Sequence, residues 1–174
     1  MNPAVVIKDT ITKLSRKDNK LKSSLQLSIP PVLSEFRWDD KNFEKLIERF
    51  IDYVLAISQP GRRVQVAVHE MTKKVDLEDF FSIFPAYWLN LSFKSQAETG
   101  FESGAKTILE DLGFHCSEWV GVEESESQLG VYRFGAQDSP VLILFVQNHG
   151  ARRNCDFLIP VVDPIPQLAQ ANCV

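Results

Sequence analysis

The chain has 174 residues, of which 44% are hydrophobic and 24% charged, and its net charge is −4. These values are typical of one soluble globular domain, and the negative charge gives no reason to expect nucleic acid as a partner. No apolar run approaches the roughly 20 residues that a membrane helix needs, and the first residues lack the pattern of a secretory signal, so neither a membrane nor export is expected.

Residues 1–24 are predicted to form a basic N-terminal helix or arm. Residues 8–22 carry many lysines and arginines but only two acidic residues, Asp9 and Asp18. A narrow apolar stripe with helical spacing runs through this segment: Ile7, Ile11, Leu14 and Leu21. Charge runs of this kind are usually solvent-facing helices, and the alternative is an arm that touches phosphate or an anionic surface.

The clearest pattern of the chain is a capped helix between two strands. Leu25 to Ile29 alternate apolar and polar residues, which predicts a short strand ended by two prolines. Apolar residues then recur at the spacing of one helix face, so we predict a helix from Lys41 to Ser58. The residues of that face are Phe43, Leu46, Ile47, Phe50, Ile51, Val54 and Leu55.

Local signals mark both ends of this helix. Asp39 is placed to cap its free N–H groups, and Trp38 is placed to pack on Phe43 as a hydrophobic staple. Pro60-Gly61 ends the helix and turns the chain. The alternation of valine with other residues over 64–68 then predicts a strand with one buried face.

The rest of the chain is predicted to add helices and mostly strands. Helices are expected over 77–84 and 105–112, the second closed by Gly113, and strands over 88–93, 114–120, 131–134, 141–146 and 156–162. Residues 70–74 are expected to form a turn or the end of a strand, loops or turns are expected over 94–103, 123–128 and 147–154, and a tail over 163–174. The apolar run 141–146 is typical of a central strand buried on both faces.

Helices on one face of a mixed sheet are the simplest way to bury these elements. The predicted fold class is therefore α+β: a two-layer α/β sandwich with a mixed, mostly antiparallel sheet and helices packed on one face. We expect it to form a single domain over residues 25–162.

Little in the sequence points to metal or nucleophile chemistry. The histidines, His69, His115 and His149, are far apart, and none pairs with a second metal ligand at the usual spacing, so no metal is expected. No histidine lies in an N-terminal helix, where a phosphoacceptor would stand. The three cysteines are widely spaced and odd in number, which favours reduced thiols in a cytoplasmic protein.

The most polar cluster beside a buried strand is residues 147–153. Loops at such positions often carry binding groups, and arginines can receive a carboxylate or phosphate. The candidates for ligand or partner contact are Asn148, His149, Arg152 and Arg153. The alternative is a plain hairpin turn with solvated arginines, which is the commoner outcome for such a segment.

The order of features over residues 27–68 resembles the ATPase domain of sensor histidine kinases, a family shared with gyrase-type and chaperone ATPases. Those domains run from a strand and a proline-rich lead-in through an aspartate, a helix bearing the N-box and a Pro-Gly turn to a V-x-V-x-V strand. Here the order is Leu27 to Pro31, Asp39-Asp40, the helix, Pro60-Gly61 and Val64 to Val68. More loosely, Gly100–Gly113 resembles the glycine-rich loop and its helix, and Asp156–Pro160 resembles the closing strand.

The resemblance implies an ATP site, but the residues that would form it depart from the family pattern. Tyr53 stands where the N-box has an asparagine that helps to hold Mg²⁺, and Arg49 replaces a second common asparagine. Tyrosine cannot supply that carbonyl ligand. The adenine-reading D-x-G-x-G is absent, and Phe101 and Glu102 are expected to crowd or repel a triphosphate.

We therefore expect a non-catalytic regulatory or protein-interaction module on a degenerate histidine-kinase-like ATPase fold, in signalling. The residues favour a non-enzyme over an enzyme, with no catalytic residue and no cofactor. The degenerate nucleotide-site positions are Arg49, Tyr53, Gly100, Gly104 and Lys106. The expected partner is a protein, a second copy of the chain (a homodimer) being one option.

Two alternatives stay open. One is an active ATP-binding enzyme with an atypical site, in which Lys106, Arg152 or Arg153 compensates for the lost residues. The other is a small-ligand-binding α+β domain unrelated to the kinases.

Overall fold

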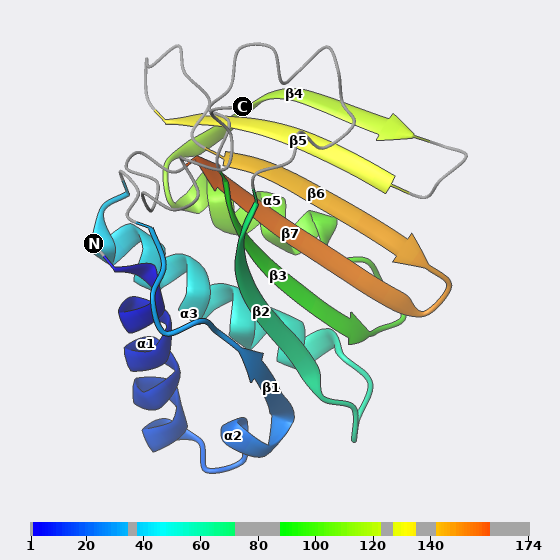
Figure 1. Ribbon diagram of the computed structural model, residues 1–174. Helices are drawn as coiled ribbons and strands as arrows, with labels where there is room; N and C mark the ends of the chain where they lie inside the picture. The colour runs from blue at the N-terminus through cyan, green and yellow to red at the C-terminus, as the bar shows by residue number, and fades with distance from the viewer. Residues whose placement is uncertain (1, 35–37, 72–87, 123–126, 135–141, 161–174) are drawn as a thin grey trace, which may run out of the picture.

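The structure, a computed structural model, describes residues 2–34, 38–71, 88–122, 127–134 and 142–160. In these ranges helices pack on one face of a seven-stranded mixed sheet, so the predicted α+β fold class is confirmed (Figure 1). The helices are α1 (Pro3–Lys17), α2 (Leu21–Ser24), α3 (Asp40–Ile57) and α5 (Glu102–Asp111). The strands are β1 (Leu25–Ser28), β2 (Val64–Met71), β3 (Trp88–Gln96), β4 (Phe114–Val122), β5 (Ser127–Phe134), β6 (Leu142–His149) and β7 (Arg152–Pro160). None of the described helices is long and apolar enough to cross a membrane.

The strand order is β1-β2-β3-β7-β6-β5-β4, which leaves β1 and β4 at the two edges. Only β1 and β2 run parallel, and the other neighbours are antiparallel. The pairing of β3 with β7 joins the N-terminal part of the sheet to the C-terminal part. As predicted, β6 is internal, and Leu142, Ile143 and Leu144 at its start are fully buried.

The local signals around α3 are confirmed. The Asp39 carboxylate accepts a hydrogen bond from the backbone N–H of Lys41 at 3.3 Å. The rings of Trp38 and Phe43 meet edge to face with centroids 6.0 Å apart, as a hydrophobic staple requires. Gly61 turns the chain with φ 77°, and the valines of β2 that face the helices are buried.

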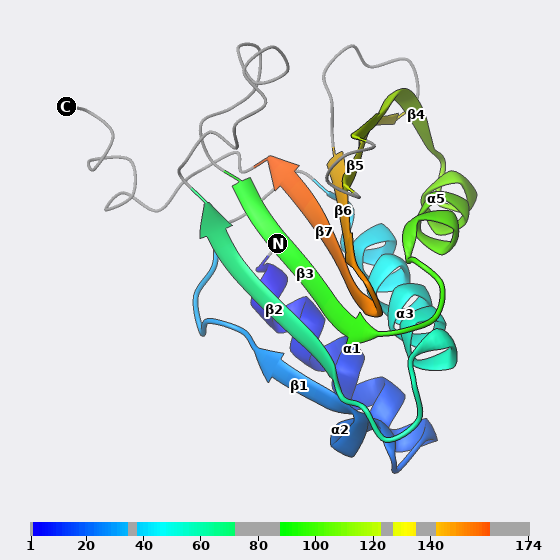
Figure 2. The same ribbon diagram turned by 90° about the vertical axis from the view of Figure 1, so that its right-hand side faces the viewer.

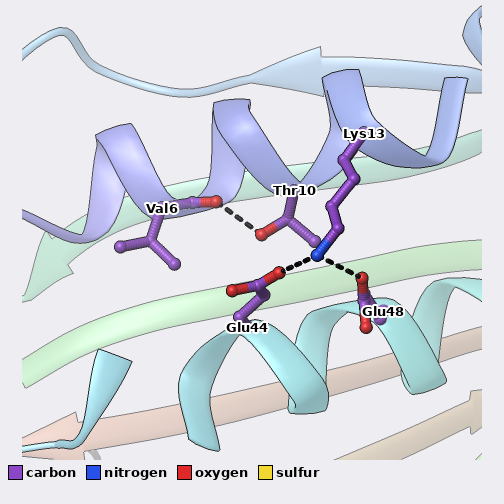
Figure 3. Close-up of polar contacts among 5 residues, drawn as sticks. All are labelled: Val6, Thr10, Lys13, Glu44 and Glu48. Carbon is purple, nitrogen blue, oxygen red and sulfur yellow. Dashed lines mark hydrogen bonds and ion pairs between the residues drawn. The ribbon is translucent and has the colours of Figure 1, made fainter. Parts of the chain in front are cut away.

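Helix α1 packs against α3 rather than standing apart from the domain. Ile7, Ile11, Leu14 and Leu21 are buried in the same cluster as the apolar face of α3. On the outside of this contact the Lys13 Nζ lies 2.7 Å from Glu44 Oε1 and 3.7 Å from Glu48 Oε1 (Figure 3). The expected solvent-facing character therefore holds only for the charged side of the helix.

Several predicted loops are wrong because strands extend into polar sequence. Residues 94–96 continue β3, Ser127 and Gln128 begin β5, and in the predicted turn 147–154 only Gly150 and Ala151 lie between strands β6 and β7. Gly150 has φ 61°, which lets a tight hairpin form and both strands continue up to it.

In β1, Leu27 is 45% exposed, so only Leu25 of the predicted apolar face is buried. The predicted helix over 77–84, the acidic residues 123–126 and the tail 163–174 lie outside the described residues.

Candidate functional site

The candidate site is a groove between α3 and α5, the two helices that the resemblance relates to the nucleotide site. It has a volume of about 500 Å³ and opens to solvent. Its walls are Arg49, Asp52 and Tyr53 from α3 and Ser103, Gly104, Thr107 and Ile108 from α5. Residues three and four apart share one side of a helix, so each helix contributes a continuous wall.

Tyr53 is packed directly on the backbone of α5. A β-carbon at Gly104 would overlap the phenol ring, so this close approach depends on glycine. The ring also lies beside Phe50, with centroids 6.0 Å apart, and its hydroxyl donates a long hydrogen bond of 3.5 Å to the Gly100 carbonyl. Tyr53 thus lines the groove with one face while it fills the space between the helices.

An ion pair joins the two helices and involves Arg49 of the groove. The Arg49 Nη2 lies 2.7 Å from Asp111 Oδ2, at the end of α5. Both side chains are largely exposed, 43% and 52%, so the contribution of the pair to stability is small. Its consequence for the site is geometric, because the ion pair holds the Arg49 side chain against α5. Asp111 escaped the sequence reasoning, since no local signal links two residues 62 positions apart.

The Gly100–Gly104 segment differs in part from expectation. Phe101 is fully buried, with its ring 6.2 Å from that of Phe50, so it does not crowd the groove as predicted. It was misassigned because an apolar residue in a polar stretch gives no sign of which way it points. The Glu102 side chain folds over Gly100, and its Oε2 is buried without a hydrogen-bond partner in the described structure.

Lys106 faces away from the groove. Its Nζ lies 3.6 Å from the ring centroid of Trp119 on β4, which is the geometry of a cation–π contact. Of the predicted nucleotide-site positions, Arg49, Tyr53 and Gly104 therefore line the groove. Gly100 is joined to it through the Tyr53 hydroxyl, and Lys106 is turned to the other side of α5.

The β6–β7 hairpin places the other candidate residues at the end of the sheet. His149 and Arg152 are opposite each other and exposed. Arg153 is half-buried and donates to the backbone carbonyls of Ala97 at 3.0 Å and Glu98 at 2.6 Å. Its role is to fix the segment that leads into Gly100, so the picture of a solvated arginine fits Arg152 but not Arg153. The Asn148 Oδ1 is buried without a partner in the described structure.

Metal and thiol chemistry find little support in the described ranges. His69, His115 and His149 are exposed and lie on three different strands, and no group of three or more metal-ligating side chains occurs there. Cys155 is buried, and burial raises the pKa of its thiol well above the ordinary value. Cys116 is exposed, and burial of its sulfur raises its pKa less strongly.

A polar network on the other face of the sheet was not predicted. Asn154 Nδ2 donates to Asp156 Oδ2 and to Gln147 Oε1, both at 3.3 Å, and Ser92 Oγ bonds to Asn154 Oδ1 at the same distance. Burial raises the pKa of Asp156, although a hydrogen bond from Ser92 and the charge of Lys94 partly offset the effect. The sequence signal was a strand with polar residues at alternate positions, which usually means a solvated face.

No family model matches the sequence, and no curated protein matches it. The mycobacterial sensor histidine kinase MprB has a similar structure, with a TM-score of 0.52 at 11% identity, over 95% of this chain and 99% of that one. The Acinetobacter baumannii histidine kinase AdeS gives 0.48 at 10% identity, over 90% of this chain and 65% of that one. The cytoplasmic segment of the histidine kinase QseC has a TM-score of 0.45 at 9% identity, over 93% of this chain and 77% of that one. At these identities the likeness is one of fold, and the match to MprB supports the conclusion that the chain has a histidine-kinase-like fold.

Proposed function

We propose that the chain is a non-catalytic regulatory or protein-interaction module in signalling, built on a degenerate histidine-kinase-like ATPase fold. The observation that carries the proposal is the packing of Tyr53 on Gly104. In the family that the sequence resembles, an asparagine at this helix position helps to hold Mg²⁺. A phenol ring pressed on α5 supplies no carbonyl ligand for Mg²⁺.

The charges around the groove support the same proposal. Arg49, at the second asparagine position, is held by Asp111 at 2.7 Å. The Glu102 carboxylate beside Gly100 would repel the phosphates of a nucleotide. Two of the three cations that an atypical enzyme would recruit are engaged elsewhere, because Lys106 lies on Trp119 and Arg153 bonds to backbone carbonyls, while Arg152 is exposed. These contacts weigh against the enzyme alternative.

Thermal unfolding with and without Mg-ATP tests the absence of nucleotide binding. A ligand that binds only the native state at 100 times its Kd stabilises it by about 2.7 kcal/mol, or roughly 5–10 °C in a chain of this size. We expect no change in the unfolding temperature at millimolar Mg-ATP, whereas an active ATPase domain of the same fold, run in parallel, should shift. A shift of several degrees in this chain that Lys106→Ala removes would support the enzyme alternative instead.

The partner is proposed to be a protein, and a second copy of the chain is one option. Sedimentation velocity over a hundredfold range of concentration distinguishes the two cases. A mass that stays at 19.8 kDa excludes self-association in this range and leaves a different protein as the proposed partner, whereas a concentration-dependent dimer indicates self-association.

A further inference from the structure

Strand β1 is an edge strand of the sheet formed by the described residues. It pairs with β2 on one side, and no described residue pairs with its other side, as Figure 2 shows at the lower end of the sheet. Proteins usually protect such an edge by keeping the strand short or by placing a charged residue or a proline in it, because unpaired backbone groups invite another strand. Strand β1 is short and is followed by Pro30 and Pro31, but its four residues, Leu25 to Ser28, include neither a charge nor a proline.

Most side chains of β1 are exposed, and one of them belongs to a large hydrophobic residue. Gln26, Leu27 and Ser28 are all exposed, and Leu27 is a leucine with 45% of its surface in contact with solvent. Its register partner on β2, Val66, is only 1% exposed. A further strand beside β1 would cover Leu27 in the way that the inner strands cover their neighbours.

Exposed cations gather at the start of this edge. Lys20 and Lys22 come just before β1, and Arg62 and Arg63 come just before β2. The strands are parallel and Leu25 is paired with Val64, so both pairs of cations lie at the same end of the sheet. None of the four forms an ion pair with a described residue. The acidic residue that is nearest in sequence to Lys20 and Lys22 is Asp18. In a chain of net charge −4 this is a marked local excess of positive charge.

We propose that the open edge of β1 binds an extended acidic segment of a partner protein as an additional strand. The backbone of the segment would pair with β1, an apolar side chain would cover Leu27, and carboxylates would meet the four cations. This is the recognition mode in which main-chain hydrogen bonds give affinity and side chains give specificity. The inference deepens the proposed function by giving the class of partner, and it involves no residue of the α3–α5 groove.

A second copy of the chain fits this edge less well. In a symmetric dimer the two copies of β1 would run antiparallel, and four residues of strand span only about 13 Å. Each copy would then bring its own lysines and arginines close to those of the other copy. Like charges at that separation oppose association, whereas an acidic segment gains from the same charges.

Selection from a random library of twelve-residue peptides displayed on phage, with the full chain as bait, tests the proposal. We expect the enriched peptides to combine acidic residues with alternating apolar ones. Their affinities can then be measured by fluorescence anisotropy of the synthetic peptides. We expect Leu27→Ser, which removes the apolar side chain without adding charge, to weaken binding by about tenfold or more, which corresponds to about 1.4 kcal/mol. Val5→Ser is the matched control, because Val5 is 51% exposed but lies on α1, and it should leave the affinity unchanged.

Charge reversal gives a second, independent measurement. The double variant Lys22→Glu/Arg62→Glu should weaken binding by about tenfold or more, and the native affinity should fall as salt rises. Lys41→Glu/Lys45→Glu on α3 makes the same charge change away from β1 and should have little effect. Thermal unfolding of each variant checks that it is folded.

Three results would overturn the proposal: no enriched peptide, enriched peptides without acidic residues, or binding that Leu27→Ser leaves intact. A dimer that Leu27→Ser dissolves would assign the edge to a second copy instead, which also contradicts it. Failure here is distinguishable from failure of the proposed function. A Mg-ATP shift would remove the non-catalytic assignment, while the peptide experiment reads only the β1 edge.

Discussion

At the scale of single residues, Tyr53 and Gly104 depend on each other. The phenol ring lies where a β-carbon of residue 104 would be, so the tyrosine in α3 requires the glycine in α5. Glycine inside a helix costs stability relative to alanine, by about 1 kcal/mol. Glycine is destabilising at position 104 in this sense, but only glycine permits the contact with Tyr53. The contributions of the two residues to stability are therefore coupled.

The effect of Gly104→Ala on the free energy of unfolding should therefore have one sign with Tyr53 at position 53 and the opposite sign with Ala there. In the native chain the added methyl group must displace the Tyr53 ring, and overpacking of this kind typically destabilises by about 1–3 kcal/mol. In a Tyr53→Ala background the space is empty, and the same substitution should stabilise by up to about 1 kcal/mol through helix propensity. Urea unfolding of the two single variants and the double variant measures this coupling.

Gly121→Ala is the control, because nothing lies within 4 Å of a β-carbon at that position. Its effect on the free energy of unfolding should be the same with Tyr53 or Ala at position 53. If Gly104→Ala likewise had one effect in both backgrounds, the ring would not occupy the position that the structure gives it.

The residues of the site could be predicted only where a local pattern marked them. Arg49, Tyr53 and Gly104 were singled out because the helix and glycine patterns that contain them are local and resemble a family. Asp111 and Asp156 were not, since Arg49 lies on a different helix from Asp111, and Ser92 lies on β3 whereas Asp156 and Asn154 lie on β7. Lys106 was assigned to the groove, but sequence alone gives no sign that Trp119 lies on the other side of α5.

At the scale of elements, helix α3 was predicted from end to end because its cap, staple and stop are all local. The ends of the strands were not, because a strand continues as far as its partner pairs with it. Residues 94–96 of β3 extend because residues 152–154 of β7 lie opposite them. Polar residues in both segments had suggested loops. Such pairings are set by the whole sheet and leave no trace in either segment alone.

Helix α1 gives the prediction at this scale, which contrasts its two kinds of contact with α3. Ile7 is fully buried, so Ile7→Ala should destabilise the chain by about 2–5 kcal/mol through lost burial and a cavity. Lys13 contacts Glu44 and Glu48 from an exposed position, so Lys13→Ala should have a much smaller effect that fades as salt rises (Figure 3). Chemical unfolding of both variants at low and high salt makes the comparison.

The same measurement bears on the predicted boundary at residue 24. A large effect of Ile7→Ala in a single cooperative transition would make α1 part of the domain. If Ile7→Ala left the main transition unchanged, the helix would be an accessory arm on a domain that starts at residue 25. The continuous buried cluster of α1 and α3 leads us to expect the first result.

At the scale of the whole molecule, the sheet is held together in the middle by β3 and β7. These strands are covered by the helices on one side, where Phe93 and Phe157 meet Phe50 of α3. On the other side they carry the Ser92–Asn154–Asp156 network beside a second apolar cluster that includes Trp88, Ile143 and Leu158. A carboxyl group at the centre of the sheet therefore links the protonation of one side chain to the stability of the entire fold.

The pH dependence of unfolding tests this link. Burial raises the pKa of Asp156 in the folded state, so the native chain holds its proton more tightly than the unfolded chain. This contribution to stability is fully present below the unfolded-state pKa and is lost as pH rises through the raised folded-state pKa. Lys94 and His69 lower that pKa and Ser92 and Asn154 bond to the carboxyl, but burial outweighs them.

Asp156→Asn keeps an acceptor for Asn154 without a charge, so it should stabilise the chain at pH 7, and the gain should shrink as pH falls towards 4. Asp9→Asn, at an exposed position on α1, is the control and should show no such trend. The free energy of unfolding of each variant is measured from pH 4 to pH 8. If Asp156→Asn stabilised the chain equally at pH 4 and at pH 8, the carboxyl would ionise as freely in the folded chain as in the unfolded one.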